Sequence, residues 1–253
     1  MPHPMTIIQP QSLANFHEVC CALSTRRGGV RPEPLGINLS FSVGDGPKNV
    51  ERNRALFFRA LDIPEANIAF TRQVHGDTVC EVQHAGTMEK CDALISNKPD
   101  LYLAISVADC VPIFLFDPVT KSIGAVHAGW RGSGAGIVTK TIEMMKERYR
   151  ANAEMMFAYI GPSAGVCCYE VGEDVASAFL PRYLDRSGEP KPHLDLKLVN
   201  RDLLLQAGLL SLQIEVSDAC TICTEELYHS FRRDGQKSGR MLGVIGLRGK
   251  SAD

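Results

Sequence analysis

The chain has 253 residues, of which 45% are hydrophobic and 22% charged, a composition typical of globular proteins that bury a large core. With 27 basic and 29 acidic residues the net charge is −2, which gives no large positive field for nucleic acid or an anionic membrane surface. The sequence offers neither the roughly 18 consecutive apolar residues of a membrane span nor a signal peptide at its start. We therefore expect a cytoplasmic protein that acts on a small molecule.

The nine cysteines are an odd number in a chain far too long to need a disulfide framework. This favours reduced thiols, some of them core residues or ligands. We find no internal repeat and no low-complexity linker, and we expect residues 1–253 to form one domain.

Both helices and strands are predicted along the chain. The segment 31–47, rich in Gly, Pro, Asn and Ser, predicts a loop, and residues 47–61 predict a helix with Pro in its first turn. Short apolar runs then predict strands at residues 101–107, 111–116 and 122–128, two of them fully buried. Strands and helices in this mixture indicate an α/β fold of mixed sheets flanked by helices.

The second half of the chain is also predicted to contain both helices and strands. From Gly136 a helix is predicted, because Val138, Ile142, Met145 and Tyr149 fall at helical spacing on one face. Further strands are expected at residues 156–162, 213–216 and 241–247, and further helices at 171–180 and 200–210, the latter with Asn200 as N-cap. Residues 187–195 are expected to be a surface loop.

Three reactive side chains stand where predicted strands end, each beside a turn-forming or small residue. They are His75 in RQVHGD, Cys110 in VADCVP and His127 in AVHAGW. If these strands are neighbours, two imidazoles and one thiolate can meet and hold a zinc ion with one open position, the arrangement of a catalytic zinc. The alternative is that each residue is an ordinary part of the core.

Glycines follow His127 and suggest a second function. Gly132, Gly134 and Gly136 lead into the predicted helix, and Arg131 lies beside them, a combination suited to an anion such as phosphate. The pattern is not a P-loop, since no Gly-Lys-Ser/Thr follows. Tight packing of strand against helix is the alternative explanation.

Other residues give weaker signals. Cys220 and Cys223 form a C-x-x-C pair, but no second pair follows, so we predict that a structural zinc there would lack ligands. Cys167, next to Cys168 after a Gly-Pro turn, is interpreted either as part of a pocket wall or as packing. The paired arginines of FRRDG, residues 231–235, are expected in a solvated loop.

These motifs together resemble the YfiH/YlmD family, which has been labelled multicopper polyphenol oxidase or laccase and also purine nucleoside phosphorylase. The matching segments run through most of the chain, and the most specific are QVHG, ADC and HAGWRG; the others are NLSFSVGD, NR at 53–54, CDALIS, IGPSAGVCCYEVG, FRRDG and GR at 239–240. The resemblance implies a mixed α/β fold shared with cysteine-hydrolase-like toxins, and a catalytic zinc held by His75, Cys110 and His127.

The resemblance also implies activities and substrates. They are phosphorolysis of adenosine, inosine, guanosine and S-methyl-5′-thioadenosine, and deamination of adenosine. Substrate contacts are expected at seven positions: Asn38, Arg54, Gln73, Asp92, Arg131, Cys167 and Tyr169. Phosphate is expected at one of the two arginines in this set. Purine nucleosides and phosphate would be the partners, with no nucleic acid and no membrane, and we expect a monomer.

The laccase label is the less favoured interpretation. A multicopper oxidase needs many imidazoles, and this chain has seven histidines, two of them near the N-terminus. Phenol oxidation would require Cu²⁺ in the zinc site, which the affinity of copper for N/S ligands permits. The His-x-Glu signature of zinc deaminases is also absent after His127, so a deamination acid or base must come from elsewhere, and the candidates are Asp92, Asp109 and Glu170.

Two other functions stay open from the sequence. Cys110 activated by His127 would suit a hydrolase or amidase with a thiolate nucleophile. The resemblance also extends to bacterial proteins linked to the editing of peptidoglycan precursors.

Overall fold

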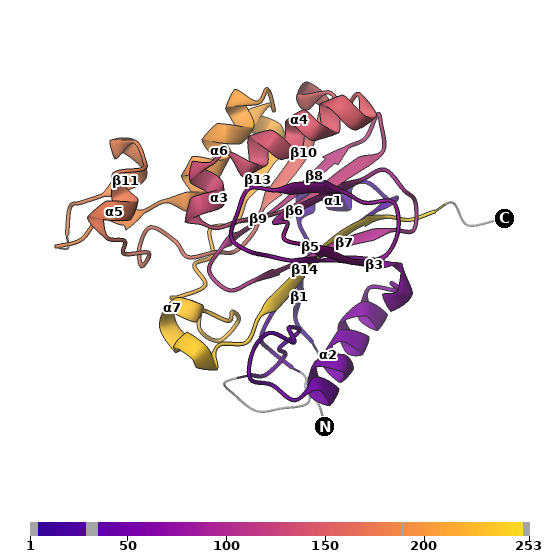
Figure 1. The fold of residues 1–253 in the computed structure, drawn as a ribbon, viewed down its shortest axis with the longest axis horizontal. Helices are drawn as coiled ribbons and strands as arrows, with labels where there is room; N and C mark the ends of the chain where they lie inside the picture. Colours follow the sequence, from indigo (N-terminus) through magenta and orange to yellow (C-terminus); the bar gives the residue numbers. More distant parts are fainter. Residues whose placement is uncertain (1–4, 29–34, 189, 250–253) are drawn as a thin grey trace.

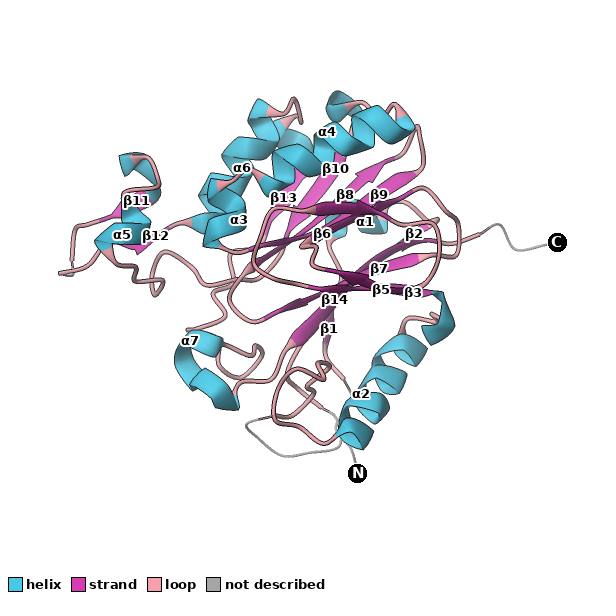
Figure 2. Cartoon of the chain, viewed as in Figure 1, coloured by secondary structure: helices cyan, strands magenta, loops and turns pink. Residues whose placement is uncertain are grey.

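The computed structural model of the chain describes residues 5–28, 35–188 and 190–249. Two six-stranded mixed sheets lie face to face, and helices cover their outer faces (Figure 1, Figure 2). The first sheet has the strand order β1-β2-β14-β7-β3-β5 and the second the order β13-β10-β8-β9-β6-β4. The prediction of a mixed α/β fold is confirmed.

Both sheets combine parallel and antiparallel pairs. The first contains β1 Ile7–Ile8, β2 Val19–Ser24, β14 Met241–Leu247, β7 Tyr102–Val107, β3 Ile68–Arg72 and β5 Gly86–Glu89, with β14 antiparallel to β2 and β7, and β3 parallel to β7. The second contains β13 Ile214–Val216, β10 Phe157–Ile160, β8 Val111–Asp117, β9 Ser122–Ala128, β6 Ala93–Ser96 and β4 Val79–Glu81, with β8 and β9 antiparallel. The chain therefore crosses between sheets after β7, in the short segment that contains Cys110.

Three longer helices form the outer layers. Helix α2 Pro47–Ala60 packs on the first sheet, and α4 Ile137–Tyr149 and α6 Leu196–Gln206 pack on the second. The shorter elements are α1 Gln11–Ala14, α3 Trp130–Gly134, α5 Glu173–Ala176, α7 Phe231–Asp234 and the two-stranded pair β11 Leu184–Asp185 and β12 His193–Leu194.

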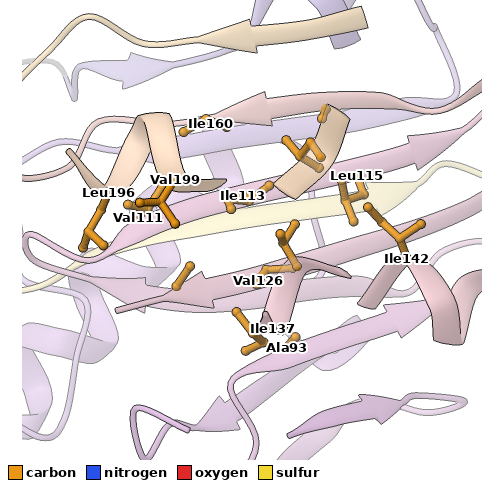
Figure 3. Close-up of a cluster of buried hydrophobic side chains, with 14 of the residues drawn as sticks. Ala93, Val111, Ile113, Leu115, Val126, Ile137, Ile142, Ile160, Leu196 and Val199 are labelled. Carbon is orange, nitrogen blue, oxygen red and sulfur yellow. The ribbon is translucent and has the colours of Figure 1, made fainter. Parts of the chain in front are cut away.

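The period of two along each strand divides the core into layers. In β8, Ile113 and Leu115 face the helices α4 and α6, whereas Phe114 and Phe116 face the other sheet. Figure 3 shows the helix-side cluster, where Ile142 of α4 and Val199 of α6 approach the second sheet. In β9, Ile123 and Ala125 lie on the inter-sheet side, which places His127 in the same row at the end of the strand.

Most predicted elements are present. The helix expected at 47–61 is α2, the helix expected after Gly136 is α4, and the runs at 101–107, 111–116 and 122–128 are β7, β8 and β9. The strands expected at 156–162, 213–216 and 241–247 are β10, β13 and β14. The predicted loop at 31–47 falls partly on residues 31–34, which lie outside the described residues.

The predicted start of the helix at Asn200 is wrong. Helix α6 begins at Leu196, and its N-cap is Asp195, whose carboxylate accepts a hydrogen bond from the Leu198 N–H at 2.9 Å. Asn200 is buried inside the helix, where its amide donates to the Ser133 hydroxyl and to the Leu196 carbonyl. Its polar side chain therefore joins α6 to α3 instead of capping a helix.

The predictions for 171–180 and 231–235 also need correction. Only Glu173–Ala176 is helical in the first segment. The second is the short helix α7, and the Arg233 guanidinium donates to the carbonyls of Thr221 and Tyr228. The arginine is thus a bonded part of the fold and not a solvated loop residue.

Within residues 5–28, 35–188 and 190–249, the structure contains no helix with the length and apolar character needed to cross a membrane.

Candidate metal centre

The three residues predicted as metal ligands meet at one end of the two sheets. His75 follows β3 of the first sheet, Cys110 lies on the crossing between β7 and β8, and His127 is near the end of β9. The ligand atoms of the three residues all lie within 4.8 Å of one another. The two imidazole rings are nearly perpendicular, at 84°, with 4.9 Å between their centroids.

A buried carboxylate orients His127. The Nδ1 atom of His127 hydrogen-bonds Asp92 Oδ1 at 2.8 Å, and both side chains are buried. With Nδ1 donating its proton to Asp92, the lone pair of Nε2 is free to bind a metal, the usual carboxylate–histidine–metal arrangement.

The same carboxylate holds the loop that carries His75. The backbone N–H groups of Val74, His75 and Gly76 all donate to the Asp92 oxygens, at 3.2, 2.9 and 2.9 Å. His75 adopts the left-handed conformation, φ 59°, which turns consecutive N–H groups toward one anion. Burial alone would raise the pKa of Asp92, but His127 and these N–H groups hold it below its ordinary value.

Cys110 and His127 form a charged pair when no metal is bound. Burial raises the pKa of Cys110, but the two neighbouring imidazoles outweigh it and lower the pKa to about 6. Burial likewise lowers the pKa of His127, but Cys110 and Asp92 raise it to about 9. At neutral pH Cys110 is therefore a thiolate, the form in which cysteine binds metals and attacks electrophiles.

The donor set suits a zinc-like ion. Two imidazoles and one thiolate give three ligands. Since Cys110, His75 and His127 all line one cleft, the fourth position of an ion held by them would be open to substrate there. The hydrogen bond from His127 to Asp92 supplies the outer-shell support that such a ligand needs.

The cleft has a volume of about 940 Å³. Of the seven positions expected to contact substrate, Arg54, Gln73 and Tyr169 line it. Asn38, Asp92, Arg131 and Cys167 are not among its lining residues, although Asp92 and Asn38 hydrogen-bond residues that are. The rest of the lining includes aromatic rings and three arginines that the sequence did not single out as substrate contacts: Phe41, Phe70, Phe231, Arg72, Arg232 and Arg240.

Two arginines of the cleft, Arg54 and Arg240, are held by backbone carbonyls and aromatic rings. Arg54 donates from Nε to the Leu39 carbonyl at 2.8 Å, and its guanidinium lies 4.6 and 4.4 Å from the ring centroids of Phe41 and Phe70. Arg240 donates to the carbonyls of Ser238 and Gly239. These contacts fix positive charge in the cleft.

Three other residues expected to contact substrate, Asn38, Arg131 and Gln73, are held by contacts within the protein. Asn38 is buried and accepts a hydrogen bond from the Arg240 N–H, so it braces the cleft rim. Arg131 is exposed on α3 with its guanidinium 4.3 Å from the Trp130 ring. Gln73 is bonded in both directions to the backbone of Ser106, at 2.8 Å each way.

The two remaining candidates for an acid or base differ in setting. Asp109, next to Cys110, accepts from the Thr221 hydroxyl at 2.6 Å and from the Arg232 N–H at 2.7 Å, with φ 84° in the left-handed region. These bonds tie the Cys110 turn to distant loops. Glu170 lies on the surface in an ion pair with Lys191.

The glycines after His127 do not form a loop before the helix. Gly132 and Gly134 are inside α3, and Gly136, φ 73°, forms the left-handed junction to α4. A Cβ at Gly132 would lie 2.8 Å from the Gly76 carbonyl oxygen, so the helix can approach the His75 loop only with glycine there.

Replacing Gly132 with Ala should lower the melting temperature by several degrees, since pushing the backbone of the His75 loop aside costs about 1–3 kcal/mol. The matched control is Gly134→Ala in the same helix, where a Cβ would meet the Phe179 ring at an ordinary 3.6 Å. Thermal unfolding should leave the control unchanged or slightly stabilised. Equal melting temperatures for both variants would contradict the close approach.

The expectation that the C-x-x-C pair lacks partners is wrong. Cys220 and Cys223 lie beside Cys167 and Cys168, and the four sulfurs are all within 4.8 Å of one another. Sequence spacing did not reveal this because the partners precede the pair by more than 50 residues.

Comparison with known proteins places the chain among relatives of similar length. A family model described as "Multi-copper polyphenol oxidoreductase laccase" matches residues 20–248. The purine nucleoside phosphorylase of Deinococcus radiodurans is 42% identical over 234 residues, with 89% of this chain and 88% of that protein covered. Purine nucleoside phosphorylase YlmD of Bacillus subtilis is 31% identical over 272 residues, covering 97% of this chain and 98% of that protein.

Solved structures agree. The hypothetical protein YfiH of Bacillus licheniformis superposes with a TM-score of 0.91 at 33% identity, over 97% of both chains. YlmD from Geobacillus stearothermophilus gives 0.88 at 32% identity, over 92% of this chain and 93% of that one. The match to the family model over most of the chain, together with these relatives, shows that the chain belongs to the YfiH/YlmD family of multi-copper polyphenol oxidoreductase laccase proteins.

Proposed function

We propose that this protein is a zinc-dependent purine nucleoside phosphorylase that acts on adenosine, inosine, guanosine and S-methyl-5′-thioadenosine, as a monomer in the cytoplasm. The observation that carries the proposal is the convergence of His75, Cys110 and His127 on one wall of a cleft of about 940 Å³ with fixed guanidinium groups. The names of the relatives give independent support, since they are called purine nucleoside phosphorylase.

Phosphorolysis needs a site for a planar base, a sugar and an anion. A phosphate oxygen attacks the anomeric carbon, the bond from that carbon to the purine nitrogen breaks, and the purine leaves with the electron pair and takes up a proton. The products are a free purine and ribose 1-phosphate. The rings of Phe41, Phe70 and Tyr169 line the cleft and offer apolar faces for the base.

Positioning and charge neutralisation would account for most of the rate, because phosphate is already a competent nucleophile once it is oriented. Of the two arginines expected to bind phosphate, Arg54 lines the cleft and Arg131 does not. Arg232 and Arg240 add positive charge to the cleft. Asp92 orients the imidazole of His127 and holds the backbone of the loop that carries His75. A zinc ion bound by the three ligands would supply Lewis-acid polarisation of substrate oxygen.

Arg54→Gln should raise the KM for phosphate about tenfold or more, the loss of one charge-assisted contact, with a smaller effect on the KM for inosine. The control is Arg72→Gln, an exposed arginine of the cleft rim that pairs with Glu89. Initial rates at varied phosphate and fixed inosine give the comparison. Unchanged phosphate dependence in the Arg54 variant would move the phosphate site elsewhere.

Adenosine deamination is proposed as a second activity of the same cleft. Water then replaces phosphate as the nucleophile, attacks the purine carbon that carries the amino group, and ammonia leaves. Asp109 and Glu170 remain the candidates for proton transfer, and only Asp109 lines the cleft. Copper in place of zinc would account for phenol oxidation in the family's description.

The decisive experiment combines metal analysis with product identification. Purified protein is incubated with inosine or adenosine, with and without phosphate, and bases, ribose 1-phosphate and ammonia are quantified. We expect hypoxanthine and ribose 1-phosphate from inosine only when phosphate is present, and loss of turnover after chelation. Absence of both purine release and deamination in zinc-loaded protein would overturn the proposal.

One observation favours a second candidate, a hydrolase or amidase with a Cys110 nucleophile. The thiolate character of Cys110 beside His127 is the electronic state that such an enzyme needs. Thiol alkylation of metal-free protein would then abolish turnover, whereas the phosphorylase proposal predicts inhibition by chelation.

The thiolate itself can be tested directly. In metal-free protein, alkylation of Cys110 by iodoacetamide should rise with a midpoint near pH 6, compared with about 9 for an ordinary thiol. Below the midpoint the thiol is protonated and slow, and above it the thiolate is fast. Peptide mass spectrometry follows the site, and His127→Gln should move the midpoint upward. A wild-type midpoint near 9 would contradict the charged pair.

A further inference from the structure

A second group of metal-binding side chains lies apart from the His75, Cys110 and His127 centre. Cys167 and Cys168 belong to the loop between β10 and α5, and Cys220 and Cys223 to the loop between β13 and α7. Their four Sγ atoms lie within 4.8 Å of one another. Among the residues that the structure describes, the clusters of three or more His, Cys, Asp or Glu with this closeness are these two.

The distances fit one tetrahedral ion. Cys223 Sγ lies 3.1 Å from Cys168 Sγ and 3.5 Å from Cys167 Sγ. Thiolates about 2.3 Å from a zinc ion are about 3.8 Å apart in a tetrahedron. A disulfide would join two of the four sulfurs and would give no reason for the other two to converge.

The backbone beside Cys220, one of the four cysteines, is arranged for a thiolate. The Gly165 N–H donates to Cys220 Sγ at 3.2 Å. Donors aimed at a sulfur favour its charged form, which is the form that binds metals. A Cβ at Gly165 would lie 3.3 Å from Cys167 Sγ and 3.4 Å from Cys220 Sγ, so glycine keeps this space open.

We propose that Cys167, Cys168, Cys220 and Cys223 bind one Zn²⁺ ion in a closed, four-thiolate structural site. Four thiolates select zinc among the common divalent ions and leave no open position for a substrate. The site is therefore structural, unlike the three-ligand centre in the cleft.

The position of the cluster indicates what the ion would stabilise. The two loops that carry the cysteines are joined by a hydrogen bond from the Thr221 N–H to the Ser163 carbonyl. Both loops also hold Asp109: the Thr221 hydroxyl donates to its carboxylate, and the Ala164 N–H donates at 2.9 Å to its carbonyl. Because Asp109 precedes Cys110, zinc at the cluster would brace the turn that carries a ligand of the other centre.

Metal stoichiometry tests the proposal. Under reducing conditions, zinc-loaded wild-type protein should hold two equivalents by elemental analysis after gel filtration. Cys223→Ser should hold one tightly, with the second bound at least about tenfold more weakly in a chelator competition, because a lost ligand costs more than a lost outer-shell partner. The control is Cys80→Ser, a partly buried cysteine outside both clusters, which should keep two equivalents.

A variant with an intact cysteine cluster decides the case if Cys223→Ser does not fold. The double variant His75→Ala/His127→Ala should keep one equivalent, and its Co²⁺ form should show the charge-transfer and ligand-field bands of a tetrahedral thiolate complex. If this variant is folded by circular dichroism and binds no metal when reduced, the proposal is overturned. A disulfide from Cys223 in the wild-type protein, together with equal metal content in the reduced wild type and in Cys223→Ser, would overturn it equally.

Discussion

Replacing His75 with Ala is expected to remove the metal of the cleft and to lower kcat/KM for inosine phosphorolysis by about 10³-fold or more. Two ligands, Cys110 and His127, remain, and they cannot hold a zinc ion in the geometry of a catalytic site. The loss corresponds to several kcal/mol of transition-state stabilisation supplied by the ion and by its orientation of substrate. Metal content and steady-state rates measured on the same preparation give the test.

The control for this variant is His84→Ala, which changes an exposed histidine outside the centre. It should keep wild-type metal content and rates. Circular dichroism separates loss of metal from loss of fold. Phosphorolysis at the wild-type rate in a His75 variant that holds no metal in the cleft would refute the mechanism. That result would not affect the cysteine cluster, which lies on other loops.

Asp92→Asn should weaken metal binding about 10- to 100-fold, the usual cost of losing an outer-shell carboxylate. An amide has one acceptor oxygen and a donating NH₂ group, so it cannot accept from His127 and from the N–H groups of Val74, His75 and Gly76 together. The variant should also unfold several degrees lower, because removing one partner of a buried charge pair costs about 3–5 kcal/mol. Zinc titration against a chelating dye and thermal unfolding measure the two effects.

A nearby carboxylate provides the matched control. Asp77 lies on the same loop and forms an exposed ion pair with Lys140, of the kind that contributes about 0–1 kcal/mol. Asp77→Asn should therefore leave metal affinity and melting temperature close to those of the wild type. If both Asn variants behave alike, Asp92 does not have the orienting role assigned to it.

The sequence predicted the parts of the fold with strong local signals. β8 and β9 lie between a helical layer and the other sheet, so both faces are buried and the strands read as continuous apolar runs. β5, with the sequence GTME, and β4, with the sequence VCE, are short and partly exposed, and neither was predicted. The order of strands depends on contacts between distant segments and leaves no local pattern.

In the candidate metal centre, too, residues with a local sequence signal were predicted and residues that act through distant contacts were not. His75, Cys110 and His127 attracted attention because reactive side chains beside small residues are unusual in strands. The role of Asp92 was not predicted, since three of its partners are backbone N–H groups and the fourth is a side chain 35 positions away. Arg232 and Arg233 suggested a solvated loop because of their charge, but they bond to carbonyls supplied by distant loops.

The crossing segment at Cys110 has a consequence for how the protein matures. One sheet supplies His75, the other supplies His127, and the third ligand is on the connection between them, so neither sheet alone carries this three-ligand centre. A chain whose two sheets have not yet packed together therefore has no preformed centre in the cleft. A metal ion bound there would for this reason mark the molecules whose two sheets have assembled.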